Sequence, residues 1–287
     1  MVAKERETKV VVSLVVVLAL LAFSLIAIGA GKPGVEELRA GKNLIPTRVY
    51  SAEEDGKILK LFEDLRVADV VDGMDKAGLR NIGLMSPDIH PAWKDTKNFK
   101  HRFIGIALTV RYVPTNWPLP PKMDTKTFDE WQGKHYETTA AEPFVDIIRQ
   151  GSAIVIDDTI GEDVGPIGSF NIMVWKQHGC IGVVTDATAR DLDEVAAQQV
   201  PLYIKEPGRA IRPGRNQTES VNRPVVCGGV LVEPGDVIVA DGDGVLVVPR
   251  THAQEVAEYA KATIEMDKPR RLEMYKKLGL PLDDSVK

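Results

Sequence analysis

The sequence predicts a layered α/β domain, in which helices pack against β-sheet. Two observations predict this class. Between residues 152 and 205, short apolar runs typical of buried strands alternate with stretches that have the apolar spacing of helices. From residue 225 to 249 the pattern changes to three β-rich runs separated by Pro-Gly-Asp and Asp-Gly-Asp-Gly turns, as in a β-meander. This second region argues against a plain doubly wound sheet.

Residues 1–30 differ from the rest of the chain and are predicted to be a signal peptide or a membrane anchor. A basic start with Lys4, Arg6 and Lys9 precedes an uncharged apolar run over residues 10–29. A run of roughly twenty apolar residues is long enough to cross a bilayer and tether the protein to it. Because the basic flank stays in the cytoplasm, we expect the remainder to be exported to a periplasmic or extracytoplasmic space. Whether the segment is cleaved stays open.

The rest of the chain is predicted to be a linker over residues 31–51 and a single domain over residues 52–287. The linker has Gly, Pro and mixed charge without clear periodicity, whereas the chain as a whole is 44% hydrophobic and can bury a full core. The net charge of −5 gives no basic surface, so nucleic acid is not an expected partner. Cys180 and Cys227 lie in apolar surroundings, which favours two buried free thiols over a disulfide.

The first half of the domain is predicted to begin with two helices. Apolar residues at three-to-four spacing predict helices over residues 53–65 and 66–79, and the apolar run over residues 103–113 predicts a strand. Residues 114–142 are rich in aromatic residues and proline and have no strong period, so they form either a long loop or an inserted helix. Long loops inside compact domains are often functional, although a simple surface excursion fits the sequence equally well.

The second half of the domain has clearer signals. A helix over residues 169–178 begins at Ser169, a good N-cap residue, and ends at Gly179. A glycine-rich turn, Gly165–Gly168, precedes it directly. The other expected elements are strands over residues 152–157, 181–186 and 201–205, a helix over residues 191–199, and a charged C-terminal helix over residues 251–278 that breaks at Pro269.

Several common catalytic motifs are missing from the sequence. It contains no GxGxxG after a strand, no GxxxxGK[ST], no HExxH, no GxSxG and no cysteine pair at metal-binding spacing, and its five histidines are scattered. These absences argue against hydride transfer on a dinucleotide fold, nucleotide hydrolysis and zinc proteolysis. A methyltransferase is also disfavoured, because no glycine-rich loop suits S-adenosylmethionine.

The candidate chemistry lies between Gly165 and Asp191. The glycine-rich turn places unpaired backbone N–H groups and the positive end of a helix dipole where a small carboxylate or phosphate can bind, although many such turns bind nothing. Arg190 and Asp191 follow the strand over residues 181–186, and the carboxyl ends of strands favour ligand sites. Arginine can bind a carboxylate through two parallel hydrogen bonds, and aspartate is an oxygen ligand for hard divalent metals. The alternative is that Asp191 caps the next helix and Arg190 is a surface residue.

Three ordered segments resemble the RraA-like superfamily, which includes 4-hydroxy-4-methyl-2-oxoglutarate aldolases, the class II pyruvate aldolases. GSFNIMVWKQHGCIGVVTDATARDLDEV resembles the core signature of that superfamily, in which an acidic residue, twenty intervening residues and Arg-Asp follow one another. VVCGGVLVEPGDVIVADGDGVLVVP is similar to the second signature, and RVADVVDGMDKAGL resembles the N-terminal helix. The resemblance covers most of residues 66–248. It implies an RraA-like swivelling β/β/α layered domain that assembles as a trimer or hexamer with sites at subunit interfaces.

The resemblance also implies an activity and roles for particular residues. The activity is a divalent-metal-dependent carbon–carbon lyase acting on small 2-oxo acids, by retro-aldol cleavage to pyruvate or by decarboxylation of oxaloacetate. Asp191 would bind Mg²⁺ or Mn²⁺, Arg190 would hold the substrate, and backbone amides around Gly168, Ser169 and Phe170 would bind the pyruvate carboxylate. A metal with an arginine is a coherent way to stabilise the negative charge of an enolate.

The chain departs from the aldolase pattern at Ser169. Twenty residues separate Ser169 from Arg190, so a serine stands where the aldolases have Asp or Glu. Glu162 and Asp163, a short way upstream, are possible substitutes. Because family members that regulate a ribonuclease also lack the full aldolase pattern, a non-catalytic regulatory or binding protein is the alternative function.

The aldolases also take a carboxylate from the C-terminal helix of a neighbouring subunit. Glu265 and Asp267 lie at about the matching place in this chain. In such a charged helix, both side chains can equally well belong to a solvated face.

Overall fold

The computed structural model describes residues 34–117, 119–158, 163–283 and 286. The chain divides into two compact units, Met1–Pro46 and Thr47–Lys287. The described part of the first unit holds helix α2 (Val35–Arg39), and the predicted signal or anchor segment lies outside the described residues. Over the part of the chain that is described, no helix is both long enough and apolar enough to span a bilayer.

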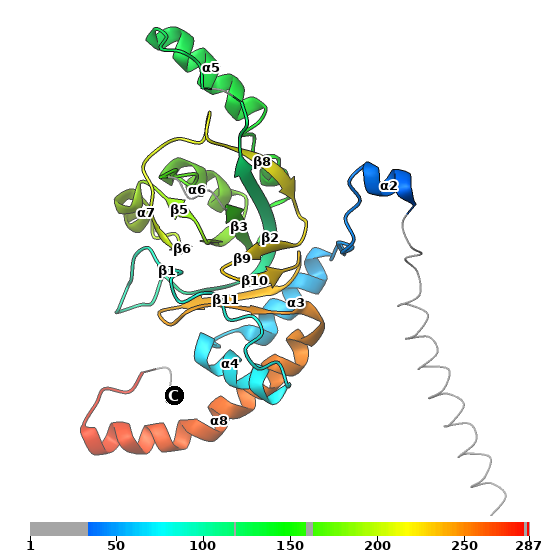
Figure 1. The fold of residues 1–287 in the computed structure, drawn as a ribbon. Coiled ribbons are helices and arrows are strands. Elements are labelled where there is room, and N and C mark those ends of the chain that lie inside the picture. The colour runs from blue at the N-terminus through cyan, green and yellow to red at the C-terminus, as the bar shows by residue number, and fades with distance from the viewer. Residues whose placement is uncertain (1–33, 118, 159–162, 284–285, 287) are drawn as a thin grey trace, which may run out of the picture. The chain divides into compact units, whose positions relative to one another are not determined.

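The second unit is built on one curled sheet of eight strands (Figure 1). Strands β2, β3, β4 and β6 run parallel to one another, whereas β1, β8, β11 and β12 add antiparallel pairings. Leu84 bridges to Leu246 in β12, so the segment before β1 brings the two sheet edges together and nearly closes the sheet. The bounds are β1 (His90–Pro91), β2 (Phe103–Pro114), β3 (Ser152–Asp158), β4 (Cys180–Thr185), β6 (Leu202–Ile204), β8 (Asn216–Val221), β11 (Val237–Asp241) and β12 (Gly244–Val248).

Helices cover this sheet on two sides (Figure 1). Helix α6 (Ser169–Gln177) packs on the parallel strands through Ile172 and Trp175, both fully buried, and α7 (Leu192–Gln198) packs beside it. On the other side, α3 (Ala52–Phe62), α4 (Val67–Lys76) and α8 (Ala253–Leu278) share a core with β11 and β12. Each of the two helix layers therefore shares its own apolar core with the sheet, as expected for a layered α/β domain. The predicted fold class is confirmed.

Two details differ from the sequence-based expectation. The region over residues 225–249 forms four strands instead of three, because a tight turn at Gly228 and Gly229, both with positive φ, separates β9 (Val225–Cys227) from β10 (Val230–Val232). Helix α8 runs through Pro269 without ending. Residues near Pro269 are exposed, so water can satisfy the carbonyl group that the proline leaves unpaired.

The aromatic-rich stretch contains an inserted helix, α5 (Thr125–Glu137), which Asp124 caps by accepting a hydrogen bond from Thr127. Both cysteines are buried and free, as expected. The remaining short elements are η1 (Pro143–Ile147), β5 (Thr188–Ala189), β7 (Glu206–Pro207) and η2 (Arg250–His252).

Candidate functional site

The candidate site lies where the start of α6 meets the connection between β5 and α7. Gly168 has an extended backbone and precedes the first turn of α6, whose N–H groups point away from the helix. The backbone N–H of Arg190 donates to the carbonyl of Ile167 over 2.8 Å. This hydrogen bond fixes the β5–α7 connection against the glycine-rich turn, so residues that are about twenty positions apart in the sequence become neighbours.

The Asp191 carboxylate lies at the start of α6. Its Oδ2 accepts hydrogen bonds from the backbone N–H of Ser169, at 3.1 Å, and from the Ser169 hydroxyl, at 3.3 Å. Asp191 also occupies the N-cap position of α7, but its side chain makes no capping hydrogen bond there, and its backbone is left-handed with φ of 57°. The alternative that Asp191 serves only to cap its own helix is therefore wrong. Its negative charge instead faces the positive end of the α6 dipole.

The turn approaches Arg190 and Asp191 so closely that a side chain on Gly165 or Gly168 would displace them. A Cβ atom on Gly168 would lie 2.9 Å from Asp191 Oδ2, 3.6 Å from Arg190 Nε and 3.7 Å from Asn171 Oδ1. A Cβ atom on Gly165 would lie 2.7 Å from the Cβ of Arg190. Polar side-chain atoms of Asp191, Arg190 and Asn171 therefore surround Gly168 on this side. Of these three residues, Arg190 and Asp191 were predicted as site residues.

Arg190 and Asp191 remain accessible from solvent. Arg190 Nε lies 3.8 Å from Asp191 Oδ1, and the two side chains are 35% and 38% exposed. Tyr136, near the end of α5, is close enough to Arg190 to be affected by its charge: burial raises the pKa of Tyr136, and the positive charge of Arg190 opposes that rise. The last turn of α5 thus lies within electrostatic range of Arg190.

Behind the site lies a largely buried carboxylate, Glu142, whose side chain is 16% exposed and which sequence reasoning did not single out. Its Oε1 accepts a hydrogen bond from Asn171 Nδ2 at 2.8 Å, and its Oε2 accepts one from Trp175 Nε1 at 3.0 Å. Arg212, whose side chain is 2% exposed, lies 3.6 Å from Glu142 Oε1. Burial raises the pKa of Glu142, and the charge of Arg212 and both hydrogen bonds oppose this rise. Local spacing gives one partial signal, since Asn171 and Trp175 are four residues apart on one helical face.

The other carboxylates considered from the sequence lie elsewhere. Asp163 forms an ion pair with the exposed Arg209, and its carboxylate is engaged there. Glu162 lies outside the described residues. Phe170, in the first turn of α6, has its side chain largely exposed and offers the site only its backbone.

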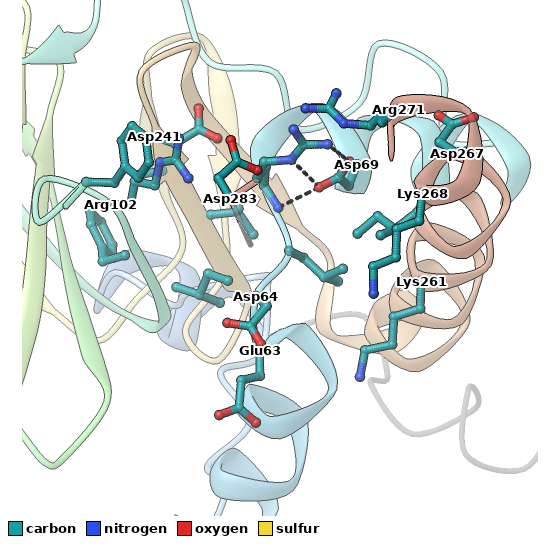
Figure 2. A pocket seen from close by; sticks show the side chains of 18 of the residues that line it. Glu63, Asp64, Asp69, Arg102, Asp241, Lys261, Asp267, Lys268, Arg271 and Asp283 are labelled. Atoms are coloured by element: carbon teal, nitrogen blue, oxygen red, sulfur yellow. Dashed lines mark hydrogen bonds and ion pairs between the residues drawn. The ribbon is translucent and has the colours of Figure 1, made fainter. Parts of the chain in front are cut away.

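Glu265 and Asp267 line a different, highly charged pocket between α4, α8 and the loop before β2 (Figure 2). Glu265 accepts a hydrogen bond from Lys268 at 2.8 Å, and neither Arg190 nor Asp191 lines this pocket. Within one chain, the structure therefore does not bring the C-terminal carboxylates to the candidate site. The expectation concerned a neighbouring subunit, so it stays a prediction.

The donor atoms at the candidate site suit a hard divalent cation. Across the described residues, no cluster of three or more His, Cys, Asp or Glu side chains could enclose a metal ion. Asp191 instead offers one carboxylate, with the Ser169 hydroxyl at 3.3 Å and with Asn171 Oδ1 beside the same Gly168 position. Mg²⁺ commonly binds through one or two carboxylates and keeps several waters. The residues present fit Mg²⁺ or Mn²⁺ in that open mode, in which Asp191 would be the charged ligand.

Comparison with known proteins identifies the family. A family model described as RraA-like, Aldolase/RraA, matches residues 67–247, which is more than half of the chain. The chain belongs to the RraA-like family. The match contains β2, α6, both residues of the Arg190-Asp191 pair and the strands up to β12, so the candidate site lies entirely inside the family domain.

Individual RraA-like relatives match the chain at modest identity. Protein DlpA of Legionella pneumophila is 27% identical over 220 residues, which are 75% of this chain and 32% of that protein. A Halalkalibacterium halodurans protein, provisionally named as a 4-hydroxy-4-methyl-2-oxoglutarate aldolase, is 34% identical over 112 residues, which are 39% of this chain and 52% of that protein. The chain thus spans about a third to a half of the length of these two relatives.

Solved structures support the same fold. An uncharacterised protein from Pseudomonas syringae pv. tomato is 27% identical, with a TM-score of 0.59, and the match covers 81% of this chain and 98% of that one. RraAS2 of Streptomyces coelicolor, described as an unusual member of an RNase ES inhibitor family, has a TM-score of 0.58 at 22% identity, over 76% of this chain and 96% of that one. The second likeness concerns the fold alone.

Proposed function

We propose that this protein is a divalent-metal-dependent carbon–carbon lyase acting on small 2-oxo acids, by retro-aldol cleavage to pyruvate or by decarboxylation of oxaloacetate. The observation that carries the proposal is the hydrogen bond between the Asp191 carboxylate and the backbone N–H of Ser169. It joins the Asp191 carboxylate to the start of α6, beside the partly exposed Arg190, and so supports a role for these groups in one site. These are the parts that binding a 2-oxo acid and stabilising its enolate require.

Each side chain has a distinct task in this proposal. When bound, a Mg²⁺ or Mn²⁺ ion held by Asp191 supplies positive charge beside the 2-oxo group of the substrate. Arg190 pairs with the substrate and offsets the negative charge that develops as the carbon–carbon bond breaks. The backbone N–H of Phe170 donates to the substrate carboxylate at the positive end of α6, while the N–H of Ser169 holds the Asp191 carboxylate in place. The Ser169 hydroxyl can orient a water molecule, although it carries no charge with which to act as a base.

The test is pyruvate release from oxaloacetate and from 4-hydroxy-2-oxo acids in the presence of Mg²⁺ or Mn²⁺. We expect turnover that chelation abolishes, and Arg190→Ala should lower kcat/KM by about 100-fold or more because it removes charge stabilisation of the transition state. Arg209→Ala is the matched control, since Arg209 is an exposed arginine paired with Asp163, and it should leave kcat/KM within about twofold. No turnover by the wild-type protein, or full turnover by Arg190→Ala, contradicts the proposal.

A second candidate is a non-catalytic regulatory or binding protein on the same scaffold. The observation that favours it is Ser169, which gives the start of α6 a hydroxyl where an aldolase has a carboxylate. Calorimetric titration with oxalate, a pyruvate analogue, separates the candidates. Metal-dependent binding of oxalate supports the lyase, whereas no binding with or without metal supports the regulator.

We further propose that the protein is exported, with residues 1–30 acting as a signal peptide or membrane anchor.

We also propose that the domain assembles as a trimer or hexamer. In this assembly, Glu265 or Asp267 reaches the site of a neighbouring subunit. Light scattering of the purified domain tests the assembly. A monomer in solution contradicts it, and a detectable fall in kcat for Glu265→Gln or Asp267→Asn supports the shared site.

A further inference from the structure

Asn171 is held in one orientation by a buried carboxylate. Both oxygens of Glu142 accept hydrogen bonds, one from Asn171 Nδ2 and the other from Trp175 Nε1. An ionised carboxylate has no hydrogen to donate, so the amide nitrogen of Asn171 must face it. The amide oxygen of Asn171 therefore points the opposite way, toward Gly168, where it lies 3.7 Å from the position of a Gly168 Cβ atom.

Asn171 Oδ1 and Asp191 Oδ2 consequently share one small space. Asp191 Oδ2 lies 2.9 Å from the same Gly168 position, so both oxygens lie within 4 Å of one point. An amide carbonyl oxygen is a good neutral ligand for hard divalent cations. The oxygen pair stands beside Ser169, where the expected carboxylate is missing.

The network behind Glu142 is more elaborate than packing alone requires. Arg212 donates to Asn216 Oδ1 at 2.9 Å, to the carbonyl of Ala140 at 3.0 Å and to Thr218 Oγ1 at 3.0 Å, and it stacks on the Tyr112 ring with its carbon 3.7 Å from the ring centre. Removing one member of a buried charged pair is costly, and such pairs add little net stability over apolar residues. These contacts hold Arg212 rigidly beside Glu142, and Glu142 in turn fixes Asn171.

We propose that Asn171 Oδ1 is an oxygen ligand, direct or through one water, of a divalent cation held by Asp191, and that Glu142 is the positioning residue that aims it there. This inference rests on the proposed metal-dependent function and deepens it. It adds a neutral oxygen ligand to a site in which Ser169 replaces the carboxylate of the aldolase pattern. A site with one carboxylate fewer should bind its metal more weakly, because affinity follows the number of charged ligands.

Titration of the full chain with Mn²⁺ alone, followed by calorimetry and by the electron paramagnetic resonance signal of free Mn²⁺, tests the ligand role. Asn171→Leu keeps the shape and removes the oxygen, and it should raise the Mn²⁺ Kd about 10- to 100-fold, as loss of a supporting metal contact does. Gln177→Leu is the matched control: it makes the same kind of change at the exposed far end of α6 and should leave the Kd within about twofold. Asp191→Asn should weaken binding at least as much as Asn171→Leu.

Two further variants keep the inference falsifiable if Asn171→Leu folds poorly. Ser169→Asp restores a carboxylate beside Asn171 and should lower the Mn²⁺ Kd about 10-fold or more, alone and in combination with Asn171→Leu. Glu142→Gln introduces an NH₂ group. If its oxygen accepts from Trp175, its NH₂ faces Asn171, whose amide then turns its nitrogen toward the metal. Glu142→Gln should therefore raise the Kd, and Ser169→Asp should rescue it, which a purely structural role for Glu142 does not predict.

The outcomes separate this inference from the proposed function. Weakened binding in Asp191→Asn with unchanged binding in Asn171→Leu leaves the proposed metal site standing and overturns the role of Asn171. Unchanged binding in Glu142→Gln overturns its positioning role. The absence of Mn²⁺ binding in the wild-type protein, at concentrations where Ser169→Asp binds, removes the metal-dependent function itself.

Discussion

At the scale of single residues, the contact between Gly168 and Asp191 decides whether the candidate site can form. No side chain can be placed on Gly168 without displacing Asp191 Oδ2, although the φ of Gly168, −121°, is open to any residue. The glycine therefore serves close approach and not backbone freedom. The same holds at Gly165, where a side chain would meet Arg190.

This contact gives a prediction for Gly168→Ala. The methyl group should push the Asp191 carboxylate from Ser169 N, and kcat/KM for pyruvate release should fall about 100-fold, the effect of a displacement near 1 Å. Gly133→Ala is the control, since a Cβ atom on Gly133 within α5 meets nothing within 4 Å. It should keep full activity and raise the free energy of unfolding by roughly 0.5–1 kcal/mol, the gain for alanine over glycine in a helix. Equal activity in the two variants contradicts the prediction.

At the scale of elements, a buried ion cluster attaches α3 to the sheet domain. Asp55, whose side chain is 5% exposed, pairs with Arg149 near the start of β3 and with Arg250 of η2, the latter at 2.5 Å. Arg250 also donates to the carbonyl of Gly235 and lies over the Tyr50 ring. One carboxylate thus joins the first helix of the domain to connections that follow it by about ninety and two hundred residues.

Asp55→Asn should destabilise the domain strongly. The change leaves the buried Arg250 without its counter-charge, and removing one partner of a buried pair costs about 3–5 kcal/mol. Glu53→Ala is the comparison on the same helix, because the exposed Glu53–Lys57 pair contributes at most about 0.5 kcal/mol. Urea denaturation of both variants measures the two values, and a loss below about 1 kcal/mol for Asp55→Asn would show that α3 is held by apolar contacts alone.

At the scale of the whole molecule, stability should depend on pH through Asp236. This carboxyl group lies between β10 and β11 and accepts hydrogen bonds from the backbone N–H groups of Glu233 and Arg250, both at 2.9 Å. Burial raises the pKa of Asp236 to about 6, and both hydrogen bonds oppose the rise. In the unfolded chain this group titrates near its ordinary pKa of about 4, so between these values unfolding releases a proton.

The raised pKa of Asp236 makes the free energy of unfolding depend on pH. Below about pH 4 the group is protonated in both states, and above about pH 6 it is ionised in both. As pH rises between these values, the contribution of Asp236 to the free energy of unfolding should fall, by something on the order of 3 kcal/mol. Asp236→Asn removes this dependence. The difference in unfolding free energy between wild type and Asp236→Asn should therefore decrease from pH 4 to pH 6.5, and parallel curves would contradict the assignment.

Local patterns predicted most of the fold and one half of the site. Apolar periodicity located α6 and β4 to within about two residues, and the rule that ligands gather at the carboxyl ends of strands placed Arg190 and Asp191 opposite the glycine-rich turn. The predicted number of strands over residues 225–249 was wrong. Two short strands joined by Gly228 and Gly229 have the pattern of a single apolar run in the sequence.

The other half of the site could not be predicted because it depends on long-range contacts. Glu142 comes 29 residues before Asn171, and the hydrogen bond between them has no counterpart in any local spacing. Arg212 is on a separate connection after β7, yet it completes the same network. The inserted α5 ends just before Glu142, so the stretch for which the sequence left a functional loop and a surface excursion equally open leads to the largely buried carboxylate behind the site.

The left-handed backbone of Asp191 limits how its chemistry can be measured. A positive φ is uncommon outside glycine, and aspartate and asparagine tolerate it best. In Asp191→Ala, the loss of the carboxylate is combined with the energetic cost of placing alanine in a left-handed backbone conformation. Asp191→Asn removes the negative charge and keeps a residue that tolerates this conformation. The left-handed backbone therefore restricts which amino acids can occupy position 191, independently of any catalytic role. Apart from glycine, the residues that adopt it most readily are aspartate and asparagine, and both carry a side-chain oxygen.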